Sequence, residues 1–163
     1  MKEEEFQDCV RRYRSLALRV GWEFLYRPED VEEVVQEALL ACWRKRRSLR
    51  SAEDFRRLLL GATVNQCRKR RRAYARTPPP PRPPGQAGAD PGAAAERAEE
   101  LSALRRALER LDEDERAVVI LCLVEGLSYQ EAARLLGLSL AALRNRLHRA
   151  RRLLRRLLED LLG

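Results

Sequence analysis

Hydrophobic side chains recur every three or four residues in the first part of the chain, which is the spacing of one face of an α-helix. Three such stripes predict a helix that runs through Val20, a second that begins at Pro28 and a third that begins near Asp54. Proline suits a helix start, because the first helical nitrogens have no partner within the helix. The stripes consist of Phe6, Val10, Tyr13, Ala17 and Val20, then Val31, Val34, Val35, Ala38 and Cys42, then Phe55, Leu58, Leu59 and Ala62.

The last part of the chain predicts four further helices. The first predicted helix carries Leu101, Leu104, Leu108 and Leu111. The second starts within residues 112–115, stops at Gly126 and carries Val118, Val119, Leu121 and Cys122. Ser128 and Glu131 then form a capping box, S-x-x-E, which opens a short helix that Gly137 ends. Ser139 can cap a final helix from about Leu140. Two helices joined by so short a turn form a helix-turn-helix, and the fold class that we expect is all-α.

Residues 77–95 interrupt these patterns. They contain seven prolines, three glycines and no large apolar side chain, so they cannot form a packed core. This composition predicts a flexible tether between two small helical domains, residues 1–76 and 96–163.

The final helix has one apolar side and one basic side. At 100° per residue, Leu140, Leu143, Leu147, Ala150 and Leu154 share a stripe, whereas the opposite side carries Asn145, His148, Arg149 and Arg152, with Arg144 at its flank. In a helix-turn-helix the second helix enters the major groove of DNA. The residues opposite the apolar stripe are therefore the candidate DNA readers.

Charge is distributed unevenly along the chain. The formal net charge is +8, which favours a polyanionic partner, either nucleic acid or an anionic membrane. Residues 29–37 hold five acids and no base, whereas residues 44–72 hold twelve bases and two acids, a net charge of +10. One acidic helix face thus precedes a strongly basic third helix.

Several classes of function are disfavoured by what the sequence lacks. No apolar run is long enough to cross a membrane and the N-terminus does not resemble a signal peptide, so we expect a cytosolic protein. Cys9, Cys42, Cys67 and Cys122 are scattered and His148 is the only histidine, which predicts buried thiols and no metal site. No catalytic triad or glycine-rich phosphate loop is apparent, so we expect no enzymatic activity, no catalytic residue and no cofactor.

Two segments resemble a known family. LVEGLSYQEAARLLGLSLAALRNRLHRARRLLRRLL resembles region four of the extracytoplasmic-function (ECF) sigma factors of bacterial RNA polymerase, and DVEEVVQEALLACWRK resembles their region two. The order of the two motifs also agrees with the family. The resemblance implies three partners: core RNA polymerase, through its β′ clamp helices and β flap; promoter DNA; and a cognate anti-sigma factor. It implies no small-molecule substrate.

The resemblance also assigns roles to particular residues. Glu33, Gln36 and Glu37 match the polymerase-docking face, and the loop of residues 46–54 matches the segment that captures a flipped base of the −10 element. The basic third helix would bind the −10 element through Asn65, Arg68, Lys69 and Arg71. Arg144, Asn145, His148 and Arg149 match the −35 contacts, to which the helical wheel adds Arg152. Ala141-Ala142 departs from the usual Gly-Thr of the family and removes a hydroxyl.

Other interpretations of these features remain open. Glu33, Gln36 and Glu37 also fit an ordinary solvated helix face, and Asn65 fits an exposed helical asparagine. Trp22 and Phe24, in a predicted loop of residues 21–27, fit either the core or a surface for a regulator. A stand-alone helix-turn-helix regulator would leave the region-two features without a role, and binding to core polymerase separates it from a sigma factor. A sigma-like mimic that titrates an anti-sigma factor would not support transcription from a promoter.

Overall fold

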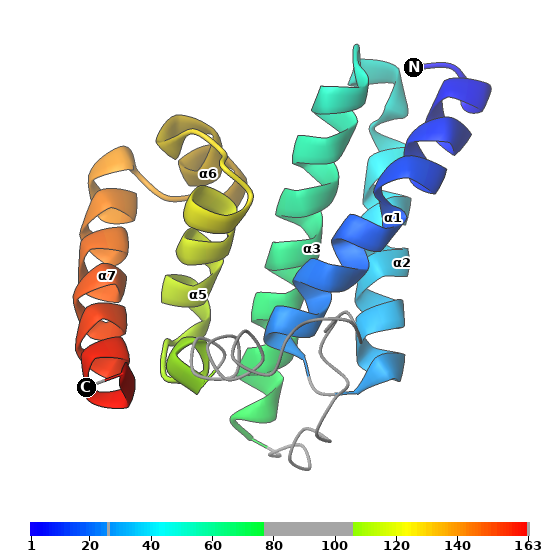
Figure 1. Ribbon diagram of the computed structural model, residues 1–163. Coiled ribbons are helices and arrows are strands. Elements are labelled where there is room, and N and C mark those ends of the chain that lie inside the picture. The colour runs from blue at the N-terminus through cyan, green and yellow to red at the C-terminus, as the bar shows by residue number, and fades with distance from the viewer. Residues whose placement is uncertain (26, 77–105, 163) are drawn as a thin grey trace. The chain divides into compact units, whose positions relative to one another are not determined.

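The computed structural model describes residues 1–25, 27–76 and 106–162 (Figure 1). Clustering in space divides the chain into two compact units, Met1–Pro84 and Gly85–Gly163. All regular elements in the described ranges are helical, which confirms the all-α prediction. The predicted tether of residues 77–95, and Leu101 and Leu104 of the predicted helix after it, lie outside the described residues.

Three long helices and one short turn build the first unit. They are α1 (Glu3–Phe24), α2 (Pro28–Arg44), the 3₁₀ turn η1 (Arg46–Ser48) and α3 (Ala52–Tyr74). As predicted, α2 begins at Pro28. The third helix starts two residues before Asp54, because the Ser51 hydroxyl accepts a hydrogen bond from the Asp54 backbone N–H at 3.1 Å and caps it.

The prediction of a loop over residues 21–27 is wrong for residues 21–24, because α1 continues to Phe24. Phe24 is buried in the core, while Trp22 is half-buried. Burial of the Phe24 ring stabilises the unit, and the ring reaches the core because the helix continues to this residue. Phe24 is therefore a core residue, one of the two alternatives that the sequence left open.

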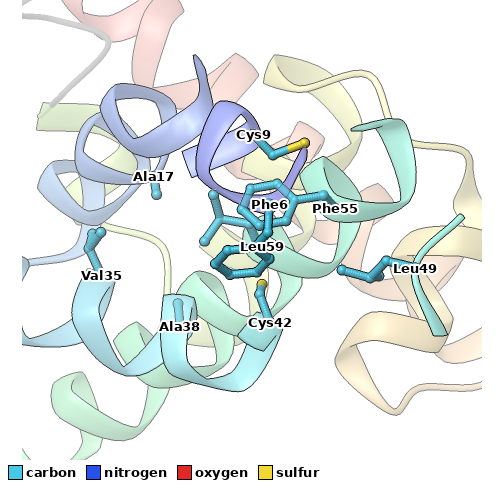
Figure 2. Packing of buried hydrophobic residues seen from close by; sticks show 9 residues of the cluster. All are labelled: Phe6, Cys9, Ala17, Val35, Ala38, Cys42, Leu49, Phe55 and Leu59. Atoms are coloured by element: carbon cyan, nitrogen blue, oxygen red, sulfur yellow. The ribbon is translucent and has the colours of Figure 1, made fainter. Parts of the chain in front are cut away.

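The core of the first unit lies where the three helices meet. Figure 2 shows nine of its buried side chains, with the rings of Phe6 and Phe55 among them. Those rings meet edge-to-face with centroids 5.2 Å apart, and Phe6 also meets Trp43 at 5.0 Å. The entire predicted stripe of α2 is buried, whereas Val10, Tyr13, Leu58 and Ala62 of the other two stripes are half-buried.

Gly21 of α1 packs tightly against Val31 of α2. A Cβ atom built at this position would lie 3.0 Å from Cγ1 of Val31, which is itself fully buried. We expect Gly21→Val to lower the free energy of unfolding of this unit by about 2 kcal/mol, because extra methyl groups overpack the contact. Urea unfolding followed by tryptophan fluorescence reports on this unit alone, since both tryptophans, Trp22 and Trp43, lie in it. The exposed Ser15→Val is the control, and equal stability of the two variants would contradict the expectation.

The second unit contains α5 (Glu113–Val119), the π-helical segment η2 (Ile120–Val124), α6 (Tyr129–Leu136) and α7 (Leu140–Leu162). The predicted caps are confirmed: the Ser128 hydroxyl accepts from the Glu131 N–H at 3.1 Å, and the Ser139 hydroxyl accepts from the Ala142 N–H at 3.1 Å. Gly137 ends α6 with a φ of 66°, in the left-handed region that favours glycine. The helix-turn-helix is therefore present as α6, a short turn and α7.

The second helix of this unit differs from the prediction in its last turn. The α-helix ends at Val119 and a π-helical turn follows, in which the Glu125 N–H donates to the Ile120 carbonyl at 2.9 Å. The run of eight apolar residues, 117–124, is too long for one face of an α-helix. Residues 117–122 are buried, and the two side chains that remain, Leu123 and Val124, are exposed.

Candidate polymerase-docking face and nucleic-acid interface

The acidic face of α2 lies opposite its buried stripe. Glu33, Gln36 and Glu37 are all exposed, as the sequence predicted. Because the stripe from Val31 to Cys42 fixes the rotation of the helix in the core, these three side chains can meet a partner without any change in packing.

An apolar groove adjoins this face. It has a volume of about 530 Å³ and lies between α1 and α2, where its walls are formed by Phe6, Val10, Gln36, Leu39, Leu40 and Trp43. Gln36 therefore belongs both to the groove and to the acidic face. Leu40 is 46% exposed, although large apolar side chains in a small domain are usually covered. The sequence pattern did not predict this groove, because Leu39 and Leu40 fit a helix without showing that α1 packs beside them.

The predicted −10 residues lie along the second half of α3. Lys69 is exposed, and Asn65, Arg68 and Arg71 are partly exposed. The side-chain oxygen Oδ1 of Asn65 accepts a hydrogen bond from Arg68 Nη1 at 3.1 Å, which orients the Asn65 amide on the helix surface. Arg71 differs from the others, because its Nη1 donates to the backbone carbonyl of Phe24 at 3.0 Å. This contact ties α3 to the end of α1 and commits part of the Arg71 guanidinium to the fold.

Arg70, which was not among the predicted residues, faces α2. Its Nη1 lies 3.1 Å from Asp30 Oδ1 and its Nη2 lies 3.1 Å from Glu33 Oε1. The other Asp30 oxygen accepts a short hydrogen bond from the Tyr74 hydroxyl. Burial raises the pKa of that hydroxyl, and the bond to Asp30 raises it further, so Tyr74 remains a proton donor. Positions 30, 33, 70 and 74 thus form one polar cluster across two helices.

The loop between α2 and α3 is held from several sides. Leu49 is buried, and the Arg46 guanidinium lies 3.9 Å from the centroid of the Trp43 ring. The amino group of Met1 donates to the carbonyls of Arg46 and Leu49, each at 3.0 Å. The sequence predicted this loop but not its two contacts with Met1, because each joins residues more than forty positions apart. These contacts hold the loop and its basic residues in one conformation.

On α7 the helical wheel is confirmed. Leu143, Leu147, Ala150 and Leu154 are buried and Leu140 is half-buried. All five residues predicted to contact the −35 element are exposed: Arg144, Asn145, His148, Arg149 and Arg152. Arg146, on another side of the helix, instead forms an ion pair with Asp114 at the start of α5. The structure thus separates one arginine that holds the unit together from those that face outward.

The cysteines are structural. All four are unpaired with one another and buried, and burial raises the pKa of each thiol, that of Cys42 to about 12. Such thiols are protonated and unreactive at neutral pH. Within residues 1–25, 27–76 and 106–162, no three His, Cys, Asp or Glu side chains are grouped as metal ligands would be.

Comparison with known proteins follows the same division into two units. Residues 9–77 match the model of Sigma-70 region 2, and residues 101–154 match that of Sigma-70 region 4. The ECF RNA polymerase sigma factor SigM of Mycobacterium tuberculosis is 31% identical over 94% of this chain and 76% of its own length. The chain belongs to the ECF sigma factors. This confirms the resemblance that the two sequence motifs carried.

One further relative and two solved structures are also similar to this chain. The ECF sigma factor SigE of Mycolicibacterium smegmatis is 28% identical over 92% of this chain, which spans only 60% of that relative. CnrH, solved in complex with the cytosolic domain of CnrY, superimposes with a TM-score of 0.67 at 28% identity, covering 98% of this chain and 90% of CnrH. The sigma factor RpoE of Bartonella quintana has the same fold, with a TM-score of 0.69 at 23% identity over 96% of this chain and 98% of RpoE.

ECF sigma factors are DNA-binding transcription-initiation factors, and this family consists of regulators rather than enzymes. No described helix of this ECF sigma factor is both long and apolar enough to span a membrane.

Proposed function

We propose that this ECF sigma factor binds core RNA polymerase and directs promoter-specific initiation by contacting the −10 and −35 elements. The observation that carries the proposal is the exposure, on two separate units of one chain, of both an acidic docking face and a basic recognition helix. In this assignment residues 1–76 act as region two, 77–95 connect the domains and 96–163 act as region four. Joining the units raises the effective concentration of the second once the first has bound.

Core polymerase is the partner proposed for α2. Glu33, Gln36 and Glu37 provide carboxylate and amide groups, and the adjoining groove accepts an apolar side chain. The β′ clamp helices of the polymerase are the proposed occupant, because a helix with basic and apolar residues complements a surface in which Gln36 joins both parts.

Leu40 tests the apolar part of this interface. We expect Leu40→Ser to weaken binding of core polymerase about tenfold with the fold intact, because the side chain is already 46% exposed and little core packing is lost. Leu40→Met keeps an apolar side chain of similar volume and is expected to bind nearly as wild type. Fluorescence anisotropy with labelled protein measures both affinities. Equal affinities for the two variants would contradict a role for the groove.

The basic half of α3 and the loop of residues 46–54 are proposed to bind the −10 element. Asn65 has the donors and the acceptor that a base edge requires, while Arg68, Lys69 and Arg71 supply positive charge for phosphates. A base can be captured at the loop only if the cost of unstacking, a few kcal/mol, is offset by contacts in a preformed surface. The buried Leu49 side chain and the contact of Arg46 with the Trp43 ring hold the loop in such a preformed surface.

The −35 element is the proposed ligand of α7. Arginine can bind guanine through O6 and N7, and Asn145 suits an adenine edge, so Arg144, Asn145, His148 and Arg149 can read the major groove. Arg152 lies one turn beyond His148 and is proposed to bind the phosphate backbone. The buried stripe of α7 holds all five side chains on one face.

Two further protein partners complete the proposal. The β flap of the polymerase is proposed to cover Leu123 and Val124, which are 43% and 64% exposed and lie in the second unit. A cognate anti-sigma factor is proposed because CnrH is solved with the cytosolic domain of CnrY, and RpoE with the anti-sigma factor NepR. We place the protein in the cytoplasm, associated with the nucleoid when bound to polymerase, and without enzymatic activity, cofactor or small-molecule substrate.

Stepwise binding assays test the proposal against its alternatives. Full-length protein should form a complex with core polymerase on size-exclusion chromatography. That complex should bind promoter DNA in preference to other DNA, whereas core polymerase alone should show no such preference. A stand-alone regulator would bind DNA without the polymerase. A mimic that only titrates an anti-sigma factor would give no promoter complex.

A further inference from the structure

The polar cluster around Arg70 joins the docking face to the basic end of α3. Figure 1 shows α2 and α3 antiparallel, so the start of α2 and the end of α3 lie at the same end of the first unit. Arg70 spans the two helices, with one guanidinium nitrogen at Asp30 and another at Glu33. The hydrogen bond to Glu33 raises the pKa of the guanidinium, which therefore carries its full charge.

The two carboxylates hold Arg70 unequally. The Asp30 side chain is 17% exposed and is also bonded by Tyr74, whereas the Glu33 side chain is 58% exposed. Ion pairs at exposed positions contribute little to stability and exchange partners readily, while those that are more buried and hydrogen-bonded persist. The Glu33 arm of the contact is therefore the one that a competing partner can break.

We propose that Arg70 is a further DNA-phosphate contact, that Glu33 holds it back in the free protein, and that docking on the polymerase releases it. The inference rests on the proposed function. A basic group of the polymerase that takes Glu33 removes the carboxylate from Arg70 Nη2, and the freed N–H groups become available to a phosphate. The Asp30 contact keeps the arginine at the end of α3 while this exchange takes place.

The position of Arg70 in the chain supports this exchange. It lies in the basic run of residues 68–72, where Lys69 and Arg71 project about 100° to either side of it on the helix. A long arginine side chain that is released from Glu33 can turn toward phosphates bound by these neighbours. Arg71 differs in that its Nη1 donates to the Phe24 carbonyl at the end of α1, which is not part of the docking face. Since binding free energies are reciprocal, DNA held by Arg70 also increases the affinity of Glu33 for the polymerase by the same factor.

The test compares two glutamates of α2 in the full-length protein. Glu33→Gln removes the carboxylate beside Arg70 Nη2 and leaves the Asp30 contact in place. Glu32→Gln removes the same charge beside Arg14 of α1, whose Nη2 lies 2.7 Å from Glu32 Oε2. Binding of a labelled single-stranded oligonucleotide is measured by anisotropy at several salt concentrations. We expect Glu33→Gln to raise the affinity about threefold and to steepen the slope of log K against log salt by about 0.7, the value for one additional phosphate contact on a single strand. Glu32→Gln should leave the slope unchanged.

A second comparison links the effect to Arg70. Glu33→Gln should have no effect on DNA affinity when Arg70→Gln is also present, and circular dichroism shows whether that double variant folds. An equal gain from Glu32→Gln, no gain from Glu33→Gln, or a gain that persists without Arg70 would each overturn the inference. The proposed function fails separately, if the wild-type protein does not bind core polymerase.

Discussion

Replacing Gln36 by Ala together with Glu37 by Lys is expected to weaken binding to core RNA polymerase about thirtyfold, which corresponds to about 2 kcal/mol. Both side chains are exposed on α2, so their loss leaves the buried stripe of that helix intact. The reversal at Glu37 accounts for most of the effect, because it places a positive charge against the basic surface expected on the partner. Anisotropy titrations of labelled protein with core polymerase give the two affinities.

The matched control carries the same chemical change on α1. Gln7 and Glu4 are also exposed, so Gln7→Ala with Glu4→Lys alters the net charge equally. We expect the control to bind polymerase within a factor of two of wild type, with unchanged circular dichroism for both double variants. Equal weakening in the two proteins would mean that net charge, and not this face, governs the interaction.

Substituting Arg149 by Ala is expected to reduce −35 recognition at one base position, at a cost of about 1–3 kcal/mol. The side chain is exposed on the face of α7 that carries Asn145 and His148, one turn from Asn145. Holoenzyme binding to a library of −35 sequences, at several salt concentrations, measures both the affinity and the base preference.

Arg152 and Arg155 provide the comparison for Arg149. Both are exposed closer to the far end of α7, and each is expected to contact the phosphate backbone. Their substitution by Ala should weaken binding evenly across all sequences and reduce the salt slope by about one unit. A uniform loss for Arg149→Ala, with the base preference unchanged, would show that Arg149 is not a reader.

The elements that the sequence predicted correctly are those that local patterns determine. The stripe of α2, the caps at Ser128 and Ser139 and the outward face of α7 all follow from residues within about three helical turns of each other. Membership of the ECF family depends on the same local motifs. Each of these features could therefore be recognised without knowing what packs against it.

Contacts between distant residues explain what the sequence did not predict. The groove beside Gln36 forms only because α1 brings Phe6 and Val10 against α2, and the Arg70 cluster joins residues forty positions apart. Likewise, an arginine of α7 that pairs with Asp114 cannot be told by spacing from one that faces outward. The π-helical turn at Ile120–Val124 arises from an apolar run that one helix face cannot bury. Tertiary packing decides all four cases.

Run-off transcription from a genomic DNA library, with cognate core polymerase and this protein, tests the account most directly. We expect transcripts from a limited set of promoters that share −10 and −35 sequences. These transcripts should be absent with core polymerase alone and strongly reduced with the Gln36→Ala, Glu37→Lys variant. Transcription no different from that of core polymerase alone, from a protein shown to be folded, would contradict it.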